Sequence, residues 1–356
     1  MKPSQKYKNF EHRRFYNIRS LIGNDWAMFY FLLGGRAAGK SYATLRFFID
    51  QWKKKKRPFY WLRLTETAAK NLLRNNAAEF VDADIRRDFN LDLITKGNCV
   101  YEVERDEKGN ITKKELMCHI LSLSTFYNNK GQALYDKDFL NDPNMYYNIC
   151  LDEMNKEECE KRTQDILYSF ANQVHNIIRN EKNRVRIICI GNLLKDASDL
   201  LVGINFIPHE FGRYKIRKLR TIIDYIPPTE AYLEEFKGSA GDLLSANAST
   251  FTNKAQVEVL DAQIHRGKLE KPHTIIKFDA DKTKWFTIWD SDILAPYNGE
   301  KCHQVIAMVP YKTGEMYIPE MMRNIIERYQ LSRFRYRNLL TERKFKNEIM
   351  LLKPRG

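Results

Sequence analysis

The stretch "GGRAAGKSYA", residues 34 to 43, decides the fold of this chain. It holds Gly34, four further residues and then Gly39-Lys40-Ser41, the complete G-x-x-x-x-G-K-[ST] spacing of a phosphate-binding loop. Glycines let such a loop turn successive backbone N–H groups toward phosphate oxygens. The lysine ammonium reaches the β- and γ-phosphates, and the serine hydroxyl is a Mg²⁺ ligand.

The residues on either side of this motif give it the context of a strand, a loop and a helix. The apolar run "WAMFYFLL" precedes it and predicts a buried strand. Apolar residues follow it at helical spacing, namely Leu45, Phe48, Ile49 and Trp52. The sequence therefore predicts that nucleotide phosphates bind along Gly34, Gly35, Arg36, Ala37, Ala38, Gly39, Lys40 and Ser41.

A second motif, "YYNICLDEM", supplies the acids that this chemistry needs. A hydrophobic run that ends in Asp152-Glu153 has the Walker B form with an additional acid. Asp152 is expected to hold Mg²⁺ through water, and Glu153 to polarise the attacking water. The next strand-like run ends "ICIGN". This pair of motifs resembles those of the additional-strand, catalytic-glutamate P-loop ATPases, in which the strand that carries a polar sensor lies between the strands of the two motifs. That resemblance makes the last residue of the run, Asn192, the candidate sensor of the γ-phosphate.

Other nucleotide-binding classes are disfavoured. The chain has no N-K-x-D motif for guanine, which argues against a Ras-like GTPase. The glycine spacing differs from that of a protein kinase. The expected cofactors are therefore ATP and Mg²⁺.

Composition narrows the class further. The chain has 356 residues, enough for two domains, and a net charge of +14. That charge favours nucleic acid as partner over a merely basic surface. No apolar run reaches 18 residues, and the basic N-terminus lacks an apolar core, so neither a membrane span nor a signal peptide is expected. The six scattered cysteines contain no C-x-x-C, which is typical of reduced cytoplasmic thiols without a zinc site.

The chain divides into two expected domains. Residues 1–228 form an ATPase domain, with a hairpin at 98–123 and a helix around 67–80. Another helix, within 163–178, carries an apolar stripe of Ile166, Phe170, Val174 and Ile177. Residues 229–250 are expected to form a linker, since the stretch 237–250 within them is rich in Gly, Ala and Ser. Residues 251–356 are expected to form a C-terminal domain with three strand-like runs.

Three segments together resemble the genome-packaging ATPases of small, short-tailed bacteriophages with protein-primed replication. They are "FLLGGRAAGKSYA", "ICLDE" and "IIRNEKNRVRIICIGN". The resemblance covers most of residues 20–228 and is weaker beyond the linker. It implies an α/β fold: a RecA-like P-loop ATPase domain with a central, mostly parallel sheet, then a smaller α+β domain of the vestigial RNase-H-like nuclease type.

The resemblance also implies partners and a place of action. The subunits would form a homo-oligomeric ring, a pentamer, at the portal (connector) vertex of an empty capsid in the host cytoplasm. ATP hydrolysis there would drive double-stranded DNA inward, with no membrane involved.

Residues that act on a neighbouring subunit follow from the same resemblance. The arginine finger of the family falls between the long helix and the sensor strand. Arg179 matches it through the "RN" pair if one residue is inserted, whereas Arg184 matches without a gap, so both stay open. Lys130, in "YNNKGQ", is the candidate for a trans-acting lysine.

The C-terminal domain has the least specific sequence. The candidate acids for a nuclease are Asp279, Asp281, Asp290 and Asp292, although "FDADKTKW" is equally a turn between strands. A vestigial domain that docks on nucleic acid, the portal or a phage structural RNA is expected, helped by the basic stretch 323–356. Two alternatives to a packaging motor remain. One is a helicase or replication-associated ATPase, and the other is a non-enzymatic, nucleotide-gated structural protein.

Overall fold

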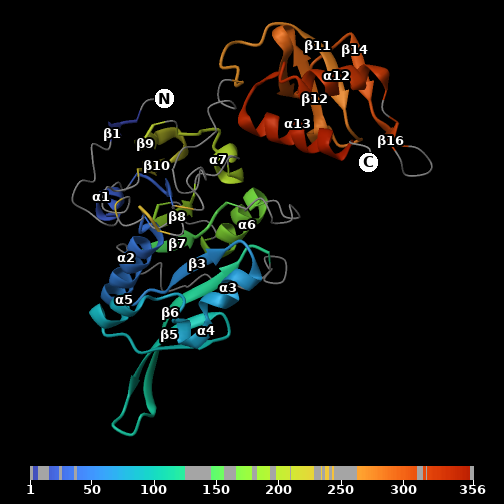
Figure 1. The fold of residues 1–356 in the computed structure, drawn as a ribbon. Coiled ribbons are helices and arrows are strands. Elements are labelled where there is room, and N and C mark those ends of the chain that lie inside the picture. Colours follow the sequence, from blue (N-terminus) through green and yellow to red (C-terminus); the bar gives the residue numbers. More distant parts are fainter. Residues whose placement is uncertain are drawn as a thin grey trace. The chain divides into compact units, whose positions relative to one another are not determined.

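The structure, a computed structural model, comprises two compact units (Figure 1). It describes residues 3–6, 16–23, 26–35, 38–124, 146–155, 166–178, 183–192, 198–208, 210–227, 234, 237–239, 243, 263–310, 316–317 and 319–352. The first unit comprises Met1–Leu200 and Pro208–Ala255. The second comprises Leu201–Ile207 and Gln256–Gly356, so the chain enters it twice. The expected linker lies almost wholly outside the described residues.

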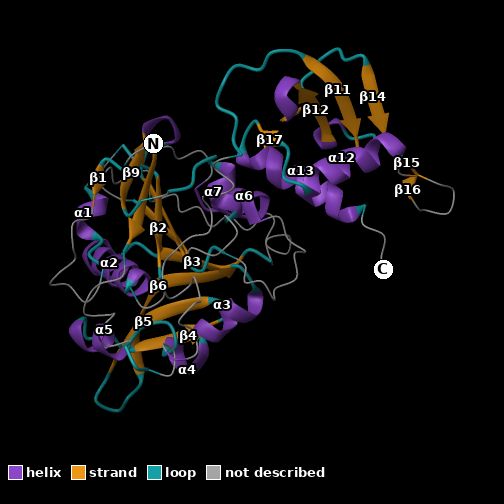
Figure 2. Cartoon of the chain, turned by 45° about the horizontal axis from the view of Figure 1, so that its top comes forward, coloured by secondary structure: helices purple, strands orange, loops and turns teal. Residues whose placement is uncertain are grey.

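A ten-stranded sheet forms the centre of the first unit (Figure 2). Its middle is parallel throughout, in the order β10 (Thr221–Ile226), β2 (Phe29–Gly34), β8 (Val185–Gly191), β7 (Tyr147–Leu151), β3 (Phe59–Arg63) and β6 (Ile111–Ser122). Antiparallel strands flank it: β9 (Gly212–Ile216) and β1 (Gln5–Lys6) beside β10, and β5 (Cys99–Arg105) and β4 (Leu93–Lys96) beside β6. The mostly parallel sheet is confirmed, and the strand of Asn192 lies between those of the two motifs.

Helix α2 (Lys40–Lys55) follows the glycine loop and packs on one face of the sheet. It begins after Gly39, whose φ of 75° is a left-handed conformation that glycine adopts without strain. The four apolar residues that predicted it are all buried. Alternate residues of β2, Tyr30 and Leu32, belong to the same core cluster, because successive side chains of a strand point to opposite faces.

The shorter helices of this unit differ partly from expectation. The helix expected around 67–80 is divided into α3 (Glu66–Leu72) and α4 (Arg74–Ala77), with Asn75 and Asn76 at positive φ. Asparagine tolerates this conformation better than most residues, which explains the break. The remaining described helices of this unit are α1 (Arg19–Ile22), α5 (Ala83–Asp88), α6 (Ile166–Ile178) and the 3₁₀ turn η3 (Arg217–Leu219). Helix α7 (Asp199–Gly203) crosses the boundary between the units, since the second unit begins at Leu201. The stripe predicted on α6 is confirmed, since all four of its residues are buried.

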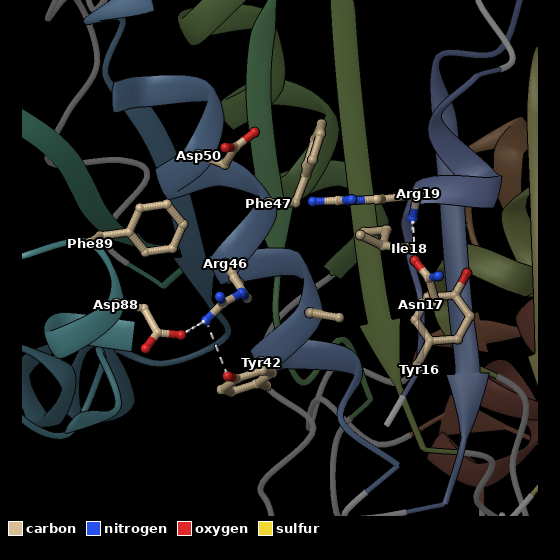
Figure 3. Close-up of a pocket in the computed structure, with 11 residues that line it drawn as sticks. Tyr16, Asn17, Ile18, Arg19, Tyr42, Arg46, Phe47, Asp50, Asp88 and Phe89 are labelled. Atoms are coloured by element: carbon tan, nitrogen blue, oxygen red, sulfur yellow. Dashed lines mark hydrogen bonds and ion pairs between the residues drawn. The ribbon is translucent and has the colours of Figure 1, made fainter. Parts of the chain in front are cut away.

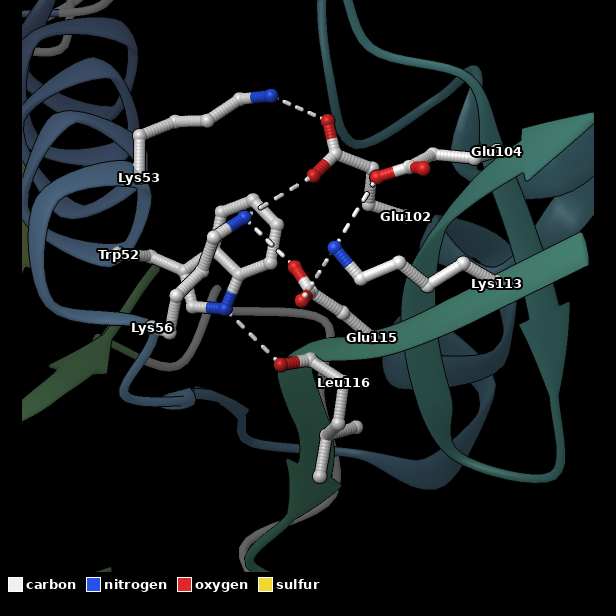
Figure 4. A network of polar contacts seen from close by, with 8 residues as sticks. All are labelled: Trp52, Lys53, Lys56, Glu102, Glu104, Lys113, Glu115 and Leu116. Atoms are coloured by element: carbon white, nitrogen blue, oxygen red, sulfur yellow. Dashed lines mark hydrogen bonds and ion pairs between the residues drawn. The ribbon is translucent and has the colours of Figure 1, made fainter.

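The predicted hairpin at 98–123 is confirmed as β5 and β6, whose far ends extend beyond the rest of the sheet (Figure 1). A polar network ties its base to the end of α2 (Figure 4). The indole of Trp52 donates to the Leu116 carbonyl at 2.9 Å, and Lys56 pairs with Glu115 at 2.6 Å. Glu102 accepts from Lys53 and, at 3.5 Å, from Lys56. The helix of the phosphate loop is therefore fixed to the hairpin.

The second unit has a five-stranded sheet covered on one face by two helices. Its strand order is β14 (Gln304–Ala307), β11 (Pro272–Lys277), β12 (Trp285–Trp289), β13 (Ile293–Pro296) and β17 (Arg335–Tyr336). The other elements are α12 (Glu320–Gln330), α13 (Leu339–Leu351), the short pair β15 (Val309–Pro310) and β16 (Met316–Tyr317), and the turns η4 (Lys282–Lys284) and η5 (Asp290–Asp292). Phe345 of α13 packs edge-on against Phe278 and Phe286 in its core. The smaller α+β domain is thereby confirmed.

Within the described part of the chain, no helix is both long enough and apolar enough to span a membrane.

Candidate nucleotide-binding site

The carboxyl ends of the parallel strands bring both sequence motifs to one edge of the sheet. Because Leu33 pairs with Gly191 and Leu151 with Cys189, β2, β8 and β7 end side by side. A cavity of about 510 Å³ lies there. Its lining residues are Ala38, Gly39, Lys40, Ser41, Tyr42, Asp152, Glu153, Ile190, Gly191 and Asn192. Residues more than 100 positions apart in the sequence thus form one site.

Lys40 is buried at the base of this cavity with only 6% of its surface exposed. Its Nζ donates to the carbonyls of Gly34 at 3.1 Å and Gly35 at 2.5 Å. Burial lowers the pKa of Lys40 from 10.5 to about 8, although the negative charge of Asp152 raises it in part. A desolvated ammonium with only neutral carbonyls as hydrogen-bond partners favours exchange of those partners for phosphate oxygens.

The two predicted Mg²⁺ ligands meet directly. The Ser41 hydroxyl donates to Oδ1 of Asp152 at 2.8 Å, and only 7% of Asp152 is exposed. A hydroxyl beside a carboxylate is an all-oxygen donor set, which is the kind that Mg²⁺ prefers when substrate phosphates and waters complete its shell. The residues present therefore fit the expected metal.

Arg63, at the end of β3, holds both acids and was missed by the sequence analysis. Its Nη1 donates to Oδ2 of Asp152 at 2.8 Å, and its Nη2 donates to Oε2 of Glu153 at 2.5 Å. The pairing of Leu62 with Leu151 aligns the end of β3 with the end of β7, which places the guanidinium there. A charged residue inside the apolar run "RPFYWLRL" was the available signal.

Glu153 is held in an unusual backbone conformation beside the cavity. Its φ is 54°, and its side chain remains 66% exposed despite the ion pair with Arg63. Non-glycine residues at positive φ are uncommon and are enriched at functional sites. An exposed carboxylate at the rim is accessible to water, as the predicted catalytic role requires.

Asn192 lines the same cavity, and the residues after Glu153 fix its backbone. The side-chain amide of Asn155 donates to the Asn192 carbonyl, and the Met154 N–H donates to the Ile190 carbonyl at 2.9 Å. Gly191 packs closely on Met154, since a Cβ added at position 191 would lie 2.8 Å from the Met154 Cε and would require that side chain to move. The acidic motif and the sensor strand therefore form one packed structure.

Of the three candidate trans-acting residues, the structure describes Arg184 alone. Lys130 and Arg179 lie outside the described residues, as do Arg36 and Ala37 of the predicted phosphate loop. Arg184 immediately precedes β8, whereas Asn192 follows its other end, so roughly 26 Å of extended chain separates them. Arg184 lies at the opposite edge of the sheet from the nucleotide site of its own subunit.

A second cavity, of about 520 Å³, shares Tyr42 with the first. Figure 3 shows the residues that line it. The Tyr42 hydroxyl donates to Asp84 at 2.6 Å, and Arg46 pairs with Asp88 at 2.7 Å. Its lining residues are Tyr16, Asn17, Ile18, Arg19, Tyr42, Ala43, Arg46, Phe47, Asp50, Asp88 and Phe89. This cavity presents aromatic rings together with polar groups.

Three of the candidate nuclease acids of the second unit form ion pairs or hydrogen bonds with neighbouring residues. Asp279 pairs with Lys284 at 2.7 Å, and Asp292 pairs with Arg328. Asp281 accepts hydrogen bonds from the backbone and side chain of Thr283. Among the described residues, no group of three or more His, Cys, Asp or Glu could hold a metal ion.

Among the comparisons with known proteins, matches come from solved structures and not from sequence. No protein-family model matches the chain, and a search of curated proteins finds no match. Two solved structures match over nearly the whole chain. The bacteriophage phi-29 viral genome packaging motor assembly has a TM-score of 0.58 at 17% identity, covering 96% of this chain and 100% of that one. The phi-28 DNA packaging motor has a TM-score of 0.57 at 14% identity, covering 96% and 99%. The chain therefore shares the fold of these phage packaging-motor chains.

Proposed function

We propose that this protein is an ATP hydrolase that drives double-stranded DNA into a preformed viral capsid. The observation that carries the proposal is the convergence of Lys40, Ser41, Asp152, Glu153 and Asn192 on one cavity. The shared fold with packaging-motor chains along nearly the full length supports packaging as the purpose of hydrolysis.

Each residue of the cavity has a chemical role in this proposal. Lys40 exchanges its carbonyl partners for the β- and γ-phosphates of ATP. Ser41 and Asp152 hold the Mg²⁺, which neutralises charge on the phosphates when bound. Glu153 releases Arg63 and accepts a proton from the attacking water. Asn192 donates its amide to the γ-phosphate and reports its loss.

The second cavity is the proposed site of the nucleotide base. It adjoins the phosphate site at Tyr42, and its rings can stack on a purine while its polar groups bind the base edge. Adenine is favoured because the chain lacks the guanine-specific N-K-x-D motif.

Hydrolysis is proposed to need a neighbouring subunit. Arg184 is remote from its own site, and α6 ends at Ile178, just before Arg179, so either arginine would act on the γ-phosphate of the next subunit. Lys130 is proposed to act in the same way. Such contacts imply a ring, proposed as a pentamer, at the portal vertex of the prohead in the host cytoplasm.

The second unit is proposed to dock on nucleic acid, the portal or a phage structural RNA. From residue 323 to 356 the chain has ten Lys or Arg against three Glu. A two-domain helicase would need a second ATPase core. The sequence beyond residue 250 has no second phosphate-loop motif. The sheet in the second unit is mixed: β11–β14 and β13–β17 pair in parallel, whereas β11–β12 and β12–β13 pair antiparallel. A packaging motor is therefore favoured over a helicase.

The decisive experiment measures ATP hydrolysis by the purified protein alone, with duplex DNA, and with duplex DNA plus empty proheads. We expect the rate to rise at each step and DNA to become nuclease-protected inside the proheads. Lys40→Ala should abolish hydrolysis and weaken ATP binding, because a charged hydrogen bond contributes about 1.5–3 kcal/mol.

Glu153→Gln is the matched variant, because it keeps the shape of the side chain. It should bind ATP normally but hydrolyse it at least ~100-fold more slowly, the scale of general-base loss. Near-normal turnover in Glu153→Gln would remove Glu153 from the catalytic role. An ATP hydrolysis rate that neither DNA nor proheads change would contradict a packaging motor.

A further inference from the structure

A short N-terminal segment, residues 16–23, lies against the phosphate loop and is here called the strap. The backbone N–H of Tyr16, at its start, donates to the carbonyl of Ala38 at 3.1 Å. Ala38 directly precedes Gly39 and Lys40, so this bond holds the loop where it enters α2. Tyr16 and Ala38 are both buried, at 5% and 6% exposure.

The bond to Ala38 answers a requirement of any phosphate loop. A loop that points its N–H groups inward at an anion points carbonyls outward, and a buried carbonyl needs a partner. For Ala38 the strap supplies that partner. A displaced strap would leave the carbonyl unpaired and the loop free to relax away from the phosphate-binding shape.

A buried ionic cluster holds the strap in place. The Tyr16 hydroxyl donates to Oδ2 of Asp224 at 2.5 Å, and Asp224 is completely buried on β10. Arg213 of β9 binds both Asp224 oxygens, at 2.7 and 2.8 Å. The same guanidinium donates to the carbonyl of Ser20 at 2.7 Å and to its hydroxyl at 3.1 Å. The strap is thus anchored to the β9–β10 hairpin at two points.

Stability alone is a weak reason for such a cluster. Replacing a buried ion pair by well-packed apolar residues is often neutral or stabilising, whereas the pair fixes geometry through directed bonds. Strand β10 also meets the loop at its other end, since a Cβ on Gly34 would come within 2.8 Å of the Ile226 carbonyl. Both ends of the phosphate loop are therefore held in position relative to β10.

We propose that Tyr16 is a positioning residue of the nucleotide site, which keeps the phosphate loop in its binding-competent shape through the hydrogen bond from its N–H to Ala38. Its hydroxyl bond to the Asp224–Arg213 pair keeps the strap docked. This inference rests on the proposed ATP-binding function. Loss of the hydroxyl lowers the docked fraction of the strap, and the apparent ATP affinity falls by that fraction.

The test is Tyr16→Phe, which keeps the ring and the backbone N–H but removes the hydroxyl. We expect the Kd for ATP to rise about tenfold, which corresponds to about 1.4 kcal/mol. The kcat at saturating ATP should change less than about twofold, because ATP itself selects the docked state. Hydrogen exchange at the residue-16 amide should be faster without ATP and return to the wild-type rate with ATP.

Tyr30→Phe is the matched control. Tyr30 is a buried tyrosine of β2 whose hydroxyl donates to the Ala27 carbonyl at 3.3 Å, away from the phosphate loop. It should leave the Kd for ATP unchanged even if the melting temperature falls as in Tyr16→Phe. An unchanged Kd in Tyr16→Phe, or an equal rise in both variants, would overturn the inference. Failure of the wild-type protein to bind ATP would instead refute the proposed function.

Discussion

At the scale of single residues, one arginine, Arg63, binds both acids of the candidate site. The Arg63 guanidinium donates to Asp152 and to Glu153. In the proposed function Mg²⁺ binds Asp152 and therefore has to compete with Arg63 for this carboxylate. The positive charge of Arg63 offsets the negative charge of the acids in the proposed site before nucleotide and metal bind. Only 13% of the Arg63 side chain is exposed, so solvent screens this competition weakly.

Arg63→Gln should therefore lower the Mg²⁺ concentration that gives half-maximal ATPase activity by at least about threefold. A hydrogen bond to a charged group contributes about 1.5–3 kcal/mol, and removing it frees Asp152 for the metal. A magnesium titration at fixed ATP measures the effect. Arg63→Lys, which retains the charge, is the control and should stay near wild type. An unchanged midpoint in Arg63→Gln would show that Arg63 does not compete with the metal.

The lowered pKa of Lys40 predicts how ATP affinity varies with pH. Below about pH 8 the buried amine is protonated and attracts phosphate, and above it the free protein progressively loses that proton. ATP affinity should be nearly flat below pH 8 and fall by up to about tenfold per pH unit above it. Binding assays from pH 6.5 to 9.5 test this. Lys40→Ala should show no such fall in affinity above pH 8. Identical profiles in both proteins would contradict the attribution of the fall to Lys40.

At the scale of elements, α2 connects the phosphate loop to the β5–β6 hairpin through Trp52 and its charged neighbours (Figure 4). The apolar contact of Trp52 and the ion pairs of its lysine neighbours contribute differently to stability. Trp52 is 1% exposed and fills the core, whereas the side chains of Lys53 and Lys56 are 28% and 46% exposed. Buried area therefore dominates the attachment, and the ion pairs mainly set its geometry.

Trp52→Leu should lower the unfolding free energy of the first unit by about 3 kcal/mol, through a cavity and a lost hydrogen bond. Glu102→Gln, which removes the charge shared by two lysines, should cost less than about 1 kcal/mol. Urea unfolding followed by circular dichroism compares the two. A larger loss in Glu102→Gln than in Trp52→Leu would reverse this order.

The connection from α6 to β8 is the element-scale origin of the finger hypothesis. α6 follows β7 and precedes β8 in the chain, and Arg184, directly before β8, falls at the edge opposite the nucleotide site. Arg179→Ala should bind ATP but fail to hydrolyse it. Mixed with Glu153→Gln it should regain activity, because some interfaces then pair intact residues; trans-acting arginines contribute about 10³–10⁵ in rate.

The measurement is the ATPase rate across mixing ratios, with Arg184→Ala assayed in parallel. Absence of rescue at every ratio would argue against a trans-acting role for Arg179. A full defect in Arg184→Ala beside a silent Arg179→Ala would assign the finger to Arg184 instead.

At the scale of the whole molecule, two features matter: the net charge of the chain and the order in which its segments enter the two units. The net charge of +14 suits a polyanion, and a motor has to grip duplex DNA through its backbone. The β9–β10 hairpin, which anchors the strap, lies in the chain between two segments of the second unit, 201–207 and the residues from 256 onward.

Binding to duplex DNA should weaken steeply with salt and depend little on sequence. Each neutralised phosphate releases counterions, so a protein with 6–10 such contacts loses roughly 10³–10⁵ in affinity between about 50 and 200 mM salt. Fluorescence anisotropy with two unrelated duplexes measures both properties. Affinity that is independent of salt, or strong preference for one duplex, would count against a translocase.

Local sequence determined the phosphate loop and the acidic strand, whereas the position of the Asn192 strand between them was expected from the class of ATPase that the motifs resemble. Gly34 to Ser41 and Asp152-Glu153 are recognisable alone because a loop and a strand end are set by neighbouring residues. The stripes of α2 and α6 were predicted for the same reason, since helical periodicity is a short-range property. The parallel strands β2, β8 and β7 then had to present these groups at one edge.

Only the tertiary structure decided which distant side chains meet. Arg63 reaches both acids because β3 pairs with β7, and Tyr16 reaches Asp224 because the strap lies against the β9–β10 hairpin, 208 residues away in sequence. Neither β9 nor β13 was predicted, and the helix expected around 67–80 is broken at Asn75 and Asn76. Such contacts and breaks depend on packing between elements, which the local pattern of a sequence does not contain.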